Sequence, residues 1–284
     1  MKPATFRYAA PNSVEDALAL LGEDEDARIL AGGQSLVPIM NFRLARPSIL
    51  IDINRIGGLD YARVEGGTLR IGALARHSTF ERQLASGPVG ALLPRIARHI
   101  AHVPIRKRGT FAGSLAHADP ASEWCTLALT AGAEIIARGP AGGRTIAAED
   151  FFDSVFTTSL EPGEMITEIA IPLFDDSWKA GFSEFARRAG DYAIVMAVAM
   201  IRLDGGRIAE ARIGLGNVIE KPIRSGKAEA LLIGELPETE LFEAAGEAAA
   251  AAVEPHEDVH SDAAYKRDLV RAMIKRALCD AVAK

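Results

Sequence analysis

The sequence predicts an α+β fold made of three consecutive units, with boundaries near residues 56 and 176. The first unit has alternating strand and helix patterns. The second unit mixes hairpin, helix and strand signals. The third unit has three predicted strands followed by helices. A chain of 284 residues is longer than one typical core and has room for two or three packed units. We therefore expect units at residues 1–56, 57–176 and 177–284.

In the first unit, a helix is predicted at residues 14–21, "VEDALALL". Ser13 is a suitable N-cap, and acidic residues occupy the first turn, where the helix dipole favours them. Residues 27–30 and 48–53 are apolar enough to be buried strands. Between them a glycine pair makes a turn, and a helix starts at Ser35 and stops before Pro47.

In the second unit, the sequence "YARVEGGTLRIGAL" predicts a hairpin that turns at Gly66 and Gly67. Residues 109–120, "GTFAGSLAHADP", are rich in small residues and are predicted to be a loop. Helices are expected at 78–86, 89–101 and 123–132, and strands at 133–139 and 164–173.

The third unit begins with a predicted three-stranded antiparallel sheet that has a tight turn at Asp204-Gly205-Gly206. The remainder of the unit is expected to be helical. The predicted strands are residues 182–189, 194–204 and 207–218, and the predicted helices are residues 226–234, 238–253 and 262–278.

Composition argues against several functions. The formal net charge is −6 with no basic run, which is unlike a protein that tracks a nucleic-acid backbone. The longest apolar run, residues 192–201, is too short for a membrane span, and the start lacks a signal-peptide core, so we expect a cytoplasmic protein. Cys125 and Cys279 are too few for a zinc ribbon or an iron–sulfur cluster.

Two small-residue segments are the strongest candidates for a binding site: "AGGQS", residues 31–35, and "GTFAGS", residues 109–114. A glycine pair by itself often only makes a turn. A backbone without side chains also lets N–H groups approach a phosphate, and a helix N-terminus favours an anion. Neither a P-loop nor a GxGxxG fingerprint is present. Two such segments in two units can instead clamp one pyrophosphate between them.

The longer stretches around both segments, "AGGQSLVPIMNFRLARPSILIDI" and "VPIRKRGTFAGSLAHADPASEW", resemble the two FAD loops of the medium subunit of molybdenum hydroxylases. This is the aerobic carbon monoxide dehydrogenase and xanthine dehydrogenase family. "RRAGDYAIV" and "YKRDLVRAMIKRAL" resemble the same family in the same order, so the resemblance covers nearly the whole chain. It implies an FAD-binding fold of the vanillyl-alcohol-oxidase (PCMH) type, followed by a C-terminal α+β domain.

The resemblance also implies which residues contact FAD. One group would hold the pyrophosphate: Ala31, Gly32, Gly33, Gln34, Ser35 and the following Leu36 from the first segment, and Thr110, Ala112, Gly113 and Ser114 from the second. Glu123 would contact the ribityl hydroxyls, with Asp119 as a second candidate. Leu160 would line the adenine pocket, with Ile100 and Val103 as further candidates, and Tyr192 would lie against the isoalloxazine. Read from residues alone, Tyr192 is instead a core aromatic on a strand.

One departure from the family pattern concerns the second segment. It commonly reads TIGGS or TIGGN, and Ala112 replaces the first of those glycines. Alanine fits if the backbone there has negative φ and is strained if φ is positive. The consequence for binding therefore depends on the local backbone.

The resemblance implies an electron-transfer flavoprotein subunit without catalytic residues or a metal of its own. A small partner subunit would carry [2Fe-2S] clusters and a large one the molybdenum cofactor, giving a heterotrimer or a dimer of trimers. Carbon monoxide, a purine, an aldehyde or an N-heterocycle are all open as substrates. One alternative is a self-contained flavin oxidase or reductase, and another is a binding module that has lost its cofactor.

A second motif, "HEDVH" at residues 256–260, matches the HExxH pattern of zinc proteases. Pro255 ends the preceding alanine-rich helix, and Ser261-Asp262 has the character of the next N-cap. The motif is therefore predicted to lie in a loop, where its two histidines do not share a helix face.

Overall fold

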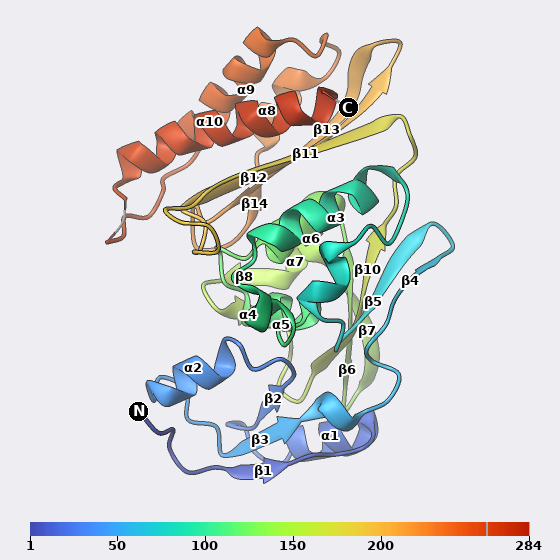
Figure 1. Cartoon of the computed structure of the whole chain (residues 1–284), viewed down its shortest axis with the longest axis vertical. Coiled ribbons are helices and arrows are strands. Elements are labelled where there is room, and N and C mark those ends of the chain that lie inside the picture. Colours follow the sequence, from blue (N-terminus) through green and yellow to red (C-terminus); the bar gives the residue numbers. More distant parts are fainter. Residues whose placement is uncertain (260, 284) are drawn as a thin grey trace.

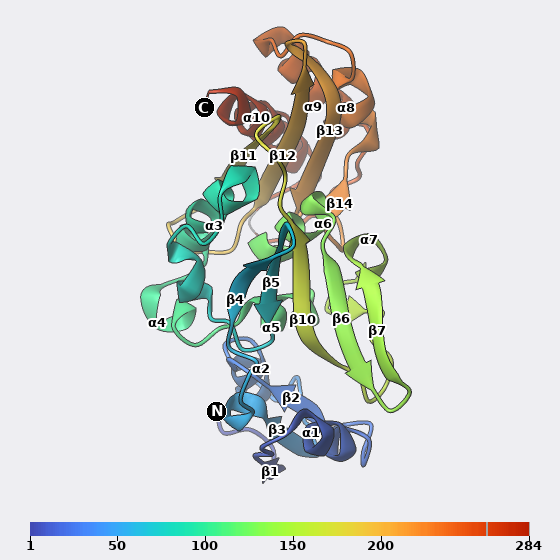
Figure 2. The ribbon, with the colours of Figure 1, turned by 90° about the vertical axis from the view of Figure 1, so that its right-hand side faces the viewer.

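The computed structural model describes residues 1–259 and 261–283, which stack as three parts along one long axis (Figure 1). The N-terminal part lies at one end and the C-terminal part at the other, with the middle part between them. Figure 2 shows the strands of the middle sheet side by side between these two ends. Residues of the N-terminal and middle parts together line the candidate site.

The N-terminal part is a parallel three-stranded sheet in the order β1-β3-β2. The predicted Ser13 cap is confirmed, because its hydroxyl accepts a hydrogen bond from the Asp16 amide at 3.1 Å. The prediction of a buried strand at 27–30 is wrong in one respect: the strand lies at the sheet edge, where Arg28 is exposed. The elements are β1 (Arg7–Ala9), α1 (Val14–Leu21), β2 (Arg28–Leu30), α2 (Leu36–Asn41) and β3 (Ile49–Asp52).

The middle part contains a five-stranded antiparallel sheet in the order β4-β5-β10-β6-β7. The predicted hairpin is confirmed: Gly66 and Gly67 have φ of 56° and 77°, as a primed turn requires. Strand β7 was not predicted, because it is mostly exposed and lacks an apolar run. The strands are β4 (Ala62–Glu65), β5 (Thr68–Gly72), β6 (Glu134–Gly139), β7 (Gly142–Ala147) and β10 (Met165–Pro172).

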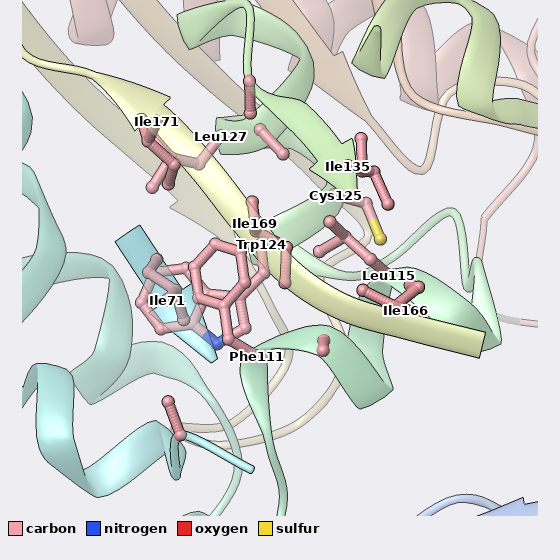
Figure 3. Packing of buried hydrophobic residues seen from close by; sticks show 14 of the residues in the cluster. Ile71, Phe111, Leu115, Trp124, Cys125, Leu127, Ile135, Ile166, Ile169 and Ile171 are labelled. Carbon is pink, nitrogen blue, oxygen red and sulfur yellow. The ribbon is translucent and has the colours of Figure 1, made fainter. Parts of the chain in front are cut away.

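Helices of the middle part pack around a buried aromatic cluster. The rings of Phe111 and Trp124 stack with centroids 4.7 Å apart, and Figure 3 shows them beside Ile71 and Ile169. Two predictions are corrected here: residues 78–86 form only a short 3-10 turn, His77–Glu81, and residues 109–120 contain a helix rather than only a loop. The remaining elements are α3 (Gly87–His99), α4 (Val103–Arg106), α5 (Phe111–His117), α6 (Glu123–Ala131), α7 (Ala148–Phe151), β8 (Phe152–Ser154) and β9 (Thr157–Thr158).

The C-terminal part is an antiparallel sheet in the order β11-β12-β13-β14, covered by helices. The second and third predicted strands are confirmed, whereas the first, expected at residues 182–189, is shifted toward the N-terminus and spans Trp178–Phe185. A fourth strand, of two residues, joins these three. It is too short to show an alternating pattern. The elements are β11 (Trp178–Phe185), β12 (Val195–Asp204), β13 (Arg207–Gly216), β14 (Ile223–Arg224), α8 (Gly226–Leu232), α9 (Thr239–Ala251) and α10 (Ala263–Val282).

The HExxH segment is confirmed to lie between helices for residues 256–259, while His260 lies outside the described residues. Asp262 caps α10, because its carboxylate accepts from the Tyr265 amide at 2.7 Å. No group of three or more potential metal ligands is found among residues 1–259 and 261–283. Within the same residues, no helix is both long and apolar enough to cross a bilayer.

Helix α6 joins the middle part to the C-terminal sheet. All of its residues are buried. A Cβ added to Gly214 would lie 1.8 Å from Oγ1 of Thr130, and one added to Gly216 would lie 2.4 Å from Oγ1 of Thr126. The two glycines of β13 therefore let α6 approach the sheet closely. This contact fixes the position of Glu123, the first residue of α6.

Candidate functional site

The first segment turns sharply between β2 and α2. Gly33 has φ of 70°, a conformation that L side chains rarely adopt, so a glycine is required there. The Gln34 side chain donates to the carbonyl of Gly32 at 3.0 Å and closes the turn on itself. Residues Ala31 to Gln34, which have small side chains apart from Gln34, therefore line a cleft mainly with backbone atoms.

The second segment is hydrogen-bonded to Ala75, which follows β5, and to His77, the first residue of the 3-10 turn. The His77 amide donates to the Gly109 carbonyl and the Phe111 amide donates to the Ala75 carbonyl, both at 3.0 Å. Thr110 then caps α5 by accepting from the Gly113 amide at 3.0 Å. A Cβ added to Gly113 would lie 2.7 Å from the Thr110 hydroxyl, so glycine at this position permits the cap.

The two segments meet backbone to backbone. A Cβ added to Gly32 would lie 2.3 Å from the Arg108 carbonyl oxygen and 2.6 Å from Cα of Gly109. In Figure 1, helix α2, which follows the first segment, lies on the side of the N-terminal part that faces α4 and α5. The predicted pairing of two small-residue segments from two parts of the chain is thus present as a direct contact.

A cleft of ≈ 360 Å³ opens beside this contact. Its lining combines the first segment with residues at the end of β3 and with Arg108, which immediately precedes the second segment. The lining residues are Leu30, Ala31, Gly32, Gly33, Gln34, Val37, Pro38, Asn41, Asp52, Asn54 and Arg108.

A buried histidine supports the second segment from below. The Trp124 indole donates to Nδ1 of His77 at 3.0 Å, so the proton of the neutral ring is on Nε2. Burial, with the nearby charges of Arg76 and Arg106, lowers the pKa of His77 to about 4. A Cβ added to Gly109 would lie 2.5 Å from Nε2 of His77. His77 therefore fills the space under Gly109 as an uncharged side chain.

Two acids and a tyrosine gather near the start of α6. Burial first, then the charges of Glu184 and Asp119, raise the pKa of Glu123 to about 8. Burial and the charges of Asp119 and Glu123 likewise raise the pKa of Tyr192. Three residues that the resemblance placed around one cofactor are thus close enough to influence one another.

Tyr192 is 68% exposed, so the expectation of a buried aromatic is wrong. An exposed ring suits a planar ligand that would cover it.

Ala112 lies in α5 and is absent from the residues with positive φ. Its methyl group is buried in the middle core. The replacement of a family glycine therefore brings no backbone strain, and the second segment keeps its helical cap.

Other predicted residues lie outside the cleft lining. Ser35 and Leu36 begin α2, and Ser114 lies within α5. Leu160 is half-buried against the middle core, Ile100 is buried at the end of α3, and Val103 is exposed at the start of α4. The structure does not bring these last three to the first segment.

Sequence reasoning missed Asn54, Arg76 and Arg108. Asp52 is the last residue of the central parallel strand β3 and Asn54 follows it, and ligands of such sheets bind outside the carboxyl ends of the strands. That rule could have found both. No comparable sequence signal marks Arg76, because its position depends on the packing of a distant segment.

Comparison with known proteins agrees with this geometry. The family described as "FAD binding domain in molybdopterin dehydrogenase" matches residues 4–174, and "CO dehydrogenase flavoprotein C-terminal domain" matches residues 180–281. The nicotine 6-hydroxylase medium subunit of Paenarthrobacter nicotinovorans is 39% identical over 284 residues, which is 100% of both chains.

Two solved structures are also similar along the whole chain. A chain of the carbon monoxide dehydrogenase of Hydrogenophaga pseudoflava is 40% identical, with a TM-score of 0.94 and coverage of 100% of this chain and 99% of that one. A chain of quinoline 2-oxidoreductase of Pseudomonas putida 86 is 38% identical, with a TM-score of 0.91 and coverage of 99% and 98%.

The fold and the two-segment site define a flavoprotein oxidoreductase subunit that has FAD as its cofactor. More narrowly, the chain belongs to the FAD-binding medium subunits of the molybdenum hydroxylase family. The resemblance found in the sequence is thereby confirmed.

Proposed function

We propose that the chain holds FAD across the contact between its N-terminal and middle parts and relays electrons through it. Electrons would arrive from [2Fe-2S] clusters of a small partner subunit and leave to an external acceptor. A large molybdenum subunit would oxidise the substrate and select it. The observation that carries this proposal is the backbone contact of Gly32 with Arg108 and Gly109, beside a cleft that the first segment lines together with Arg108.

The roles of individual residues follow from their positions. Two groups of residues are proposed to hold the pyrophosphate: Ala31, Gly32, Gly33, Gln34, Ser35 and Leu36 from one side, and Thr110, Ala112, Gly113 and Ser114 from the other. The Gly113 and Ser114 amides already donate to Thr110, so these two residues would act mainly by leaving room for the phosphates. Hydrogen bonds from the remaining amides to a charged group would contribute about 1.5–3 kcal/mol each. Glu123 and Asp119 would bind the ribityl hydroxyls, and Leu160, Ile100 and Val103 the adenine. The exposed ring of Tyr192 would pack against the isoalloxazine.

The acids near α6 suit this task chemically. Because Glu123 retains a proton near neutral pH, it can donate a hydrogen bond as well as accept one. The raised pKa of Tyr192 likewise keeps its hydroxyl protonated. FAD supplies the redox chemistry when bound, and the protein contributes binding, orientation and a local electrostatic environment.

The division of labour is consistent with the cysteines. The chain has two, of which Cys125 is buried in the middle core and Cys279 is half-buried in α10. Clusters need four ligands, so they would belong to another subunit. We propose a cytoplasmic heterotrimer, or a dimer of such trimers.

The first test is an absorption spectrum of the purified chain after incubation with FAD and removal of the excess. We expect stoichiometric FAD that heat releases intact. A chain that is folded by circular dichroism and retains no flavin, alone and in complex with its partners, would contradict the proposal.

A second test separates an electron relay from a self-contained oxidase. Substrate oxidation should require the molybdenum subunit, and the isolated FAD-loaded chain should be inactive. Turnover of an organic substrate by the isolated chain would favour the self-contained enzyme.

A further inference from the structure

Asn54 ties the first segment to the end of strand β3. Its side-chain amide donates to the Ala31 carbonyl at 2.8 Å and to Oδ1 of Asp52 at 2.6 Å. Asp52 in turn accepts from the hydroxyl of Tyr8 at 2.7 Å. Both donors of the Asn54 amide are therefore used, and this fixes which way its oxygen points.

Arg76 connects that oxygen to the second segment. Its Nη2 donates to Oδ1 of Asn54 and its Nη1 donates to the Arg108 carbonyl, each at 2.5 Å. A guanidinium can span two acceptors because its donors form a rigid planar fork, which a lysine lacks. A continuous chain of hydrogen bonds thus runs from Ala31 through Asn54 and Arg76 to Arg108.

This chain of bonds crosses the same place where Gly32 touches Arg108. The carbonyls of Ala31 and Arg108, one in each segment, are both fixed by it. The steric contact sets the closest approach of the two segments, and the hydrogen bonds prevent them from separating.

The charge at this place is not balanced by an ion pair. Within residues 1–259 and 261–283, neither Arg76 nor Arg108 lies within 4.0 Å of a carboxylate. Asp52 and Asp60 act on Arg76 only at longer range. Burial and the charge of Arg108 lower the pKa of Arg76, so an anion placed beside the two guanidinium groups would stabilise their charge.

We propose that Asn54 and Arg76 are positioning residues that set the spacing of the two segments and supply the positive charge for the pyrophosphate of the dinucleotide. The inference rests on the proposed function, and both Asn54 and Arg76 lie outside the small-residue segments. Asn54 acts through the Ala31 carbonyl, and Arg76 acts both through the Arg108 carbonyl and through its charge.

The test compares four variants of the full chain by FAD titration: Asn54→Ala, Arg76→Lys, Arg76→Gln and the control Arg55→Lys. Arg55 lines the same neighbouring hollow as Arg76 but has no hydrogen bond to either segment in the described part of the chain. Asn54→Ala and Arg76→Lys should each raise the Kd for FAD about tenfold or more, because each loses at least one bridging hydrogen bond. Arg55→Lys should bind as the wild type does.

Salt dependence separates spacing from charge. Arg76→Gln should weaken binding and also flatten the rise of Kd with ionic strength, because a cation beside the phosphates has been removed. Asn54→Ala and Arg76→Lys should keep the wild-type salt dependence. A purely structural role of Arg76 would not change this slope.

The stability of each apo-protein, measured by urea unfolding, shows whether a variant has simply lost its fold. Wild-type Kd values for both Asn54→Ala and Arg76→Lys would overturn the inference. So would an equal loss in the Arg55→Lys control. If the wild-type chain itself binds no FAD, the proposed function fails, which is a different outcome from a wild type that binds and variants that match it.

Discussion

His99 on α3 and Glu184 on β11 face each other across the junction of the middle and C-terminal parts, with Nδ1 and Oε1 3.3 Å apart. The Glu184 side chain is only 3% exposed. Its second oxygen, Oε2, is buried without a hydrogen-bond partner in the described part of the chain. A buried oxygen without a hydrogen bond is costly, and the charge of Glu184 is, after burial, the largest cause of the raised pKa of its neighbour Glu123.

The pH dependence of stability should be traceable to Glu123. Its pKa is raised from 4.5 to about 8 by burial, Glu184 and Asp119. The folded chain therefore keeps a proton that the unfolded chain releases, and stability should fall as pH rises from about 4.5 to 8. Glu123→Gln should reduce this fall, as measured by urea unfolding of the apo-chain at several pH values.

Glu149→Gln is a matched control, because Glu149 is exposed at the start of α7. It should keep the wild-type pH dependence. The same pH dependence in Glu123→Gln and in the wild type would show that Glu123 does not carry the effect.

Removing the His77 acceptor of the Trp124 hydrogen bond should lower the free energy of unfolding. In His77→Leu the buried indole N–H loses its partner, which costs about 1–3 kcal/mol of unfolding free energy. In His77→Asn the side-chain oxygen can still accept from it, so the loss should be smaller. Urea unfolding of the two variants checks this order, and equal losses would count against it.

Gly32→Ala should abolish or strongly weaken FAD binding. A Cβ at this position would lie 2.3 Å from the Arg108 carbonyl oxygen, so the two segments would have to separate. Gly57→Ala is the control, because a Cβ there has nothing within 4 Å and its φ is not positive. Flavin content after gel filtration reports the result; full occupancy in Gly32→Ala would disprove the close contact.

Ala112→Gly should leave FAD affinity unchanged, because Ala112 already has a helical backbone. It should instead lower stability by about 0.5–1 kcal/mol, the usual cost of glycine within a helix. Titration with FAD and urea unfolding of the same preparation measure both. A large gain in affinity would show that the alanine impairs the second segment.

Much of the fold was predictable because its signals are local. The Ser13 cap, the hairpin at Gly66 and Gly67 and the turn at Gly205 and Gly206 each depend on a few adjacent residues. Strands β7 and β14 were missed, since one is largely exposed and the other has two residues. Helix α5 was missed because its small residues have the composition of a loop.

The sequence by itself indicated the family and the cofactor through its resemblance to known FAD loops. It also marked the two small-residue segments, because glycines and caps impose local backbone geometry that does not depend on distant residues. Only the tertiary structure decided how the segments meet. Gly32 touches Arg108, and Asn54 is bonded to Arg76, although the members of each pair lie far apart in the chain. It also decided that Tyr192 is exposed and Glu123 protonated, since exposure and pKa depend on what packs around a side chain.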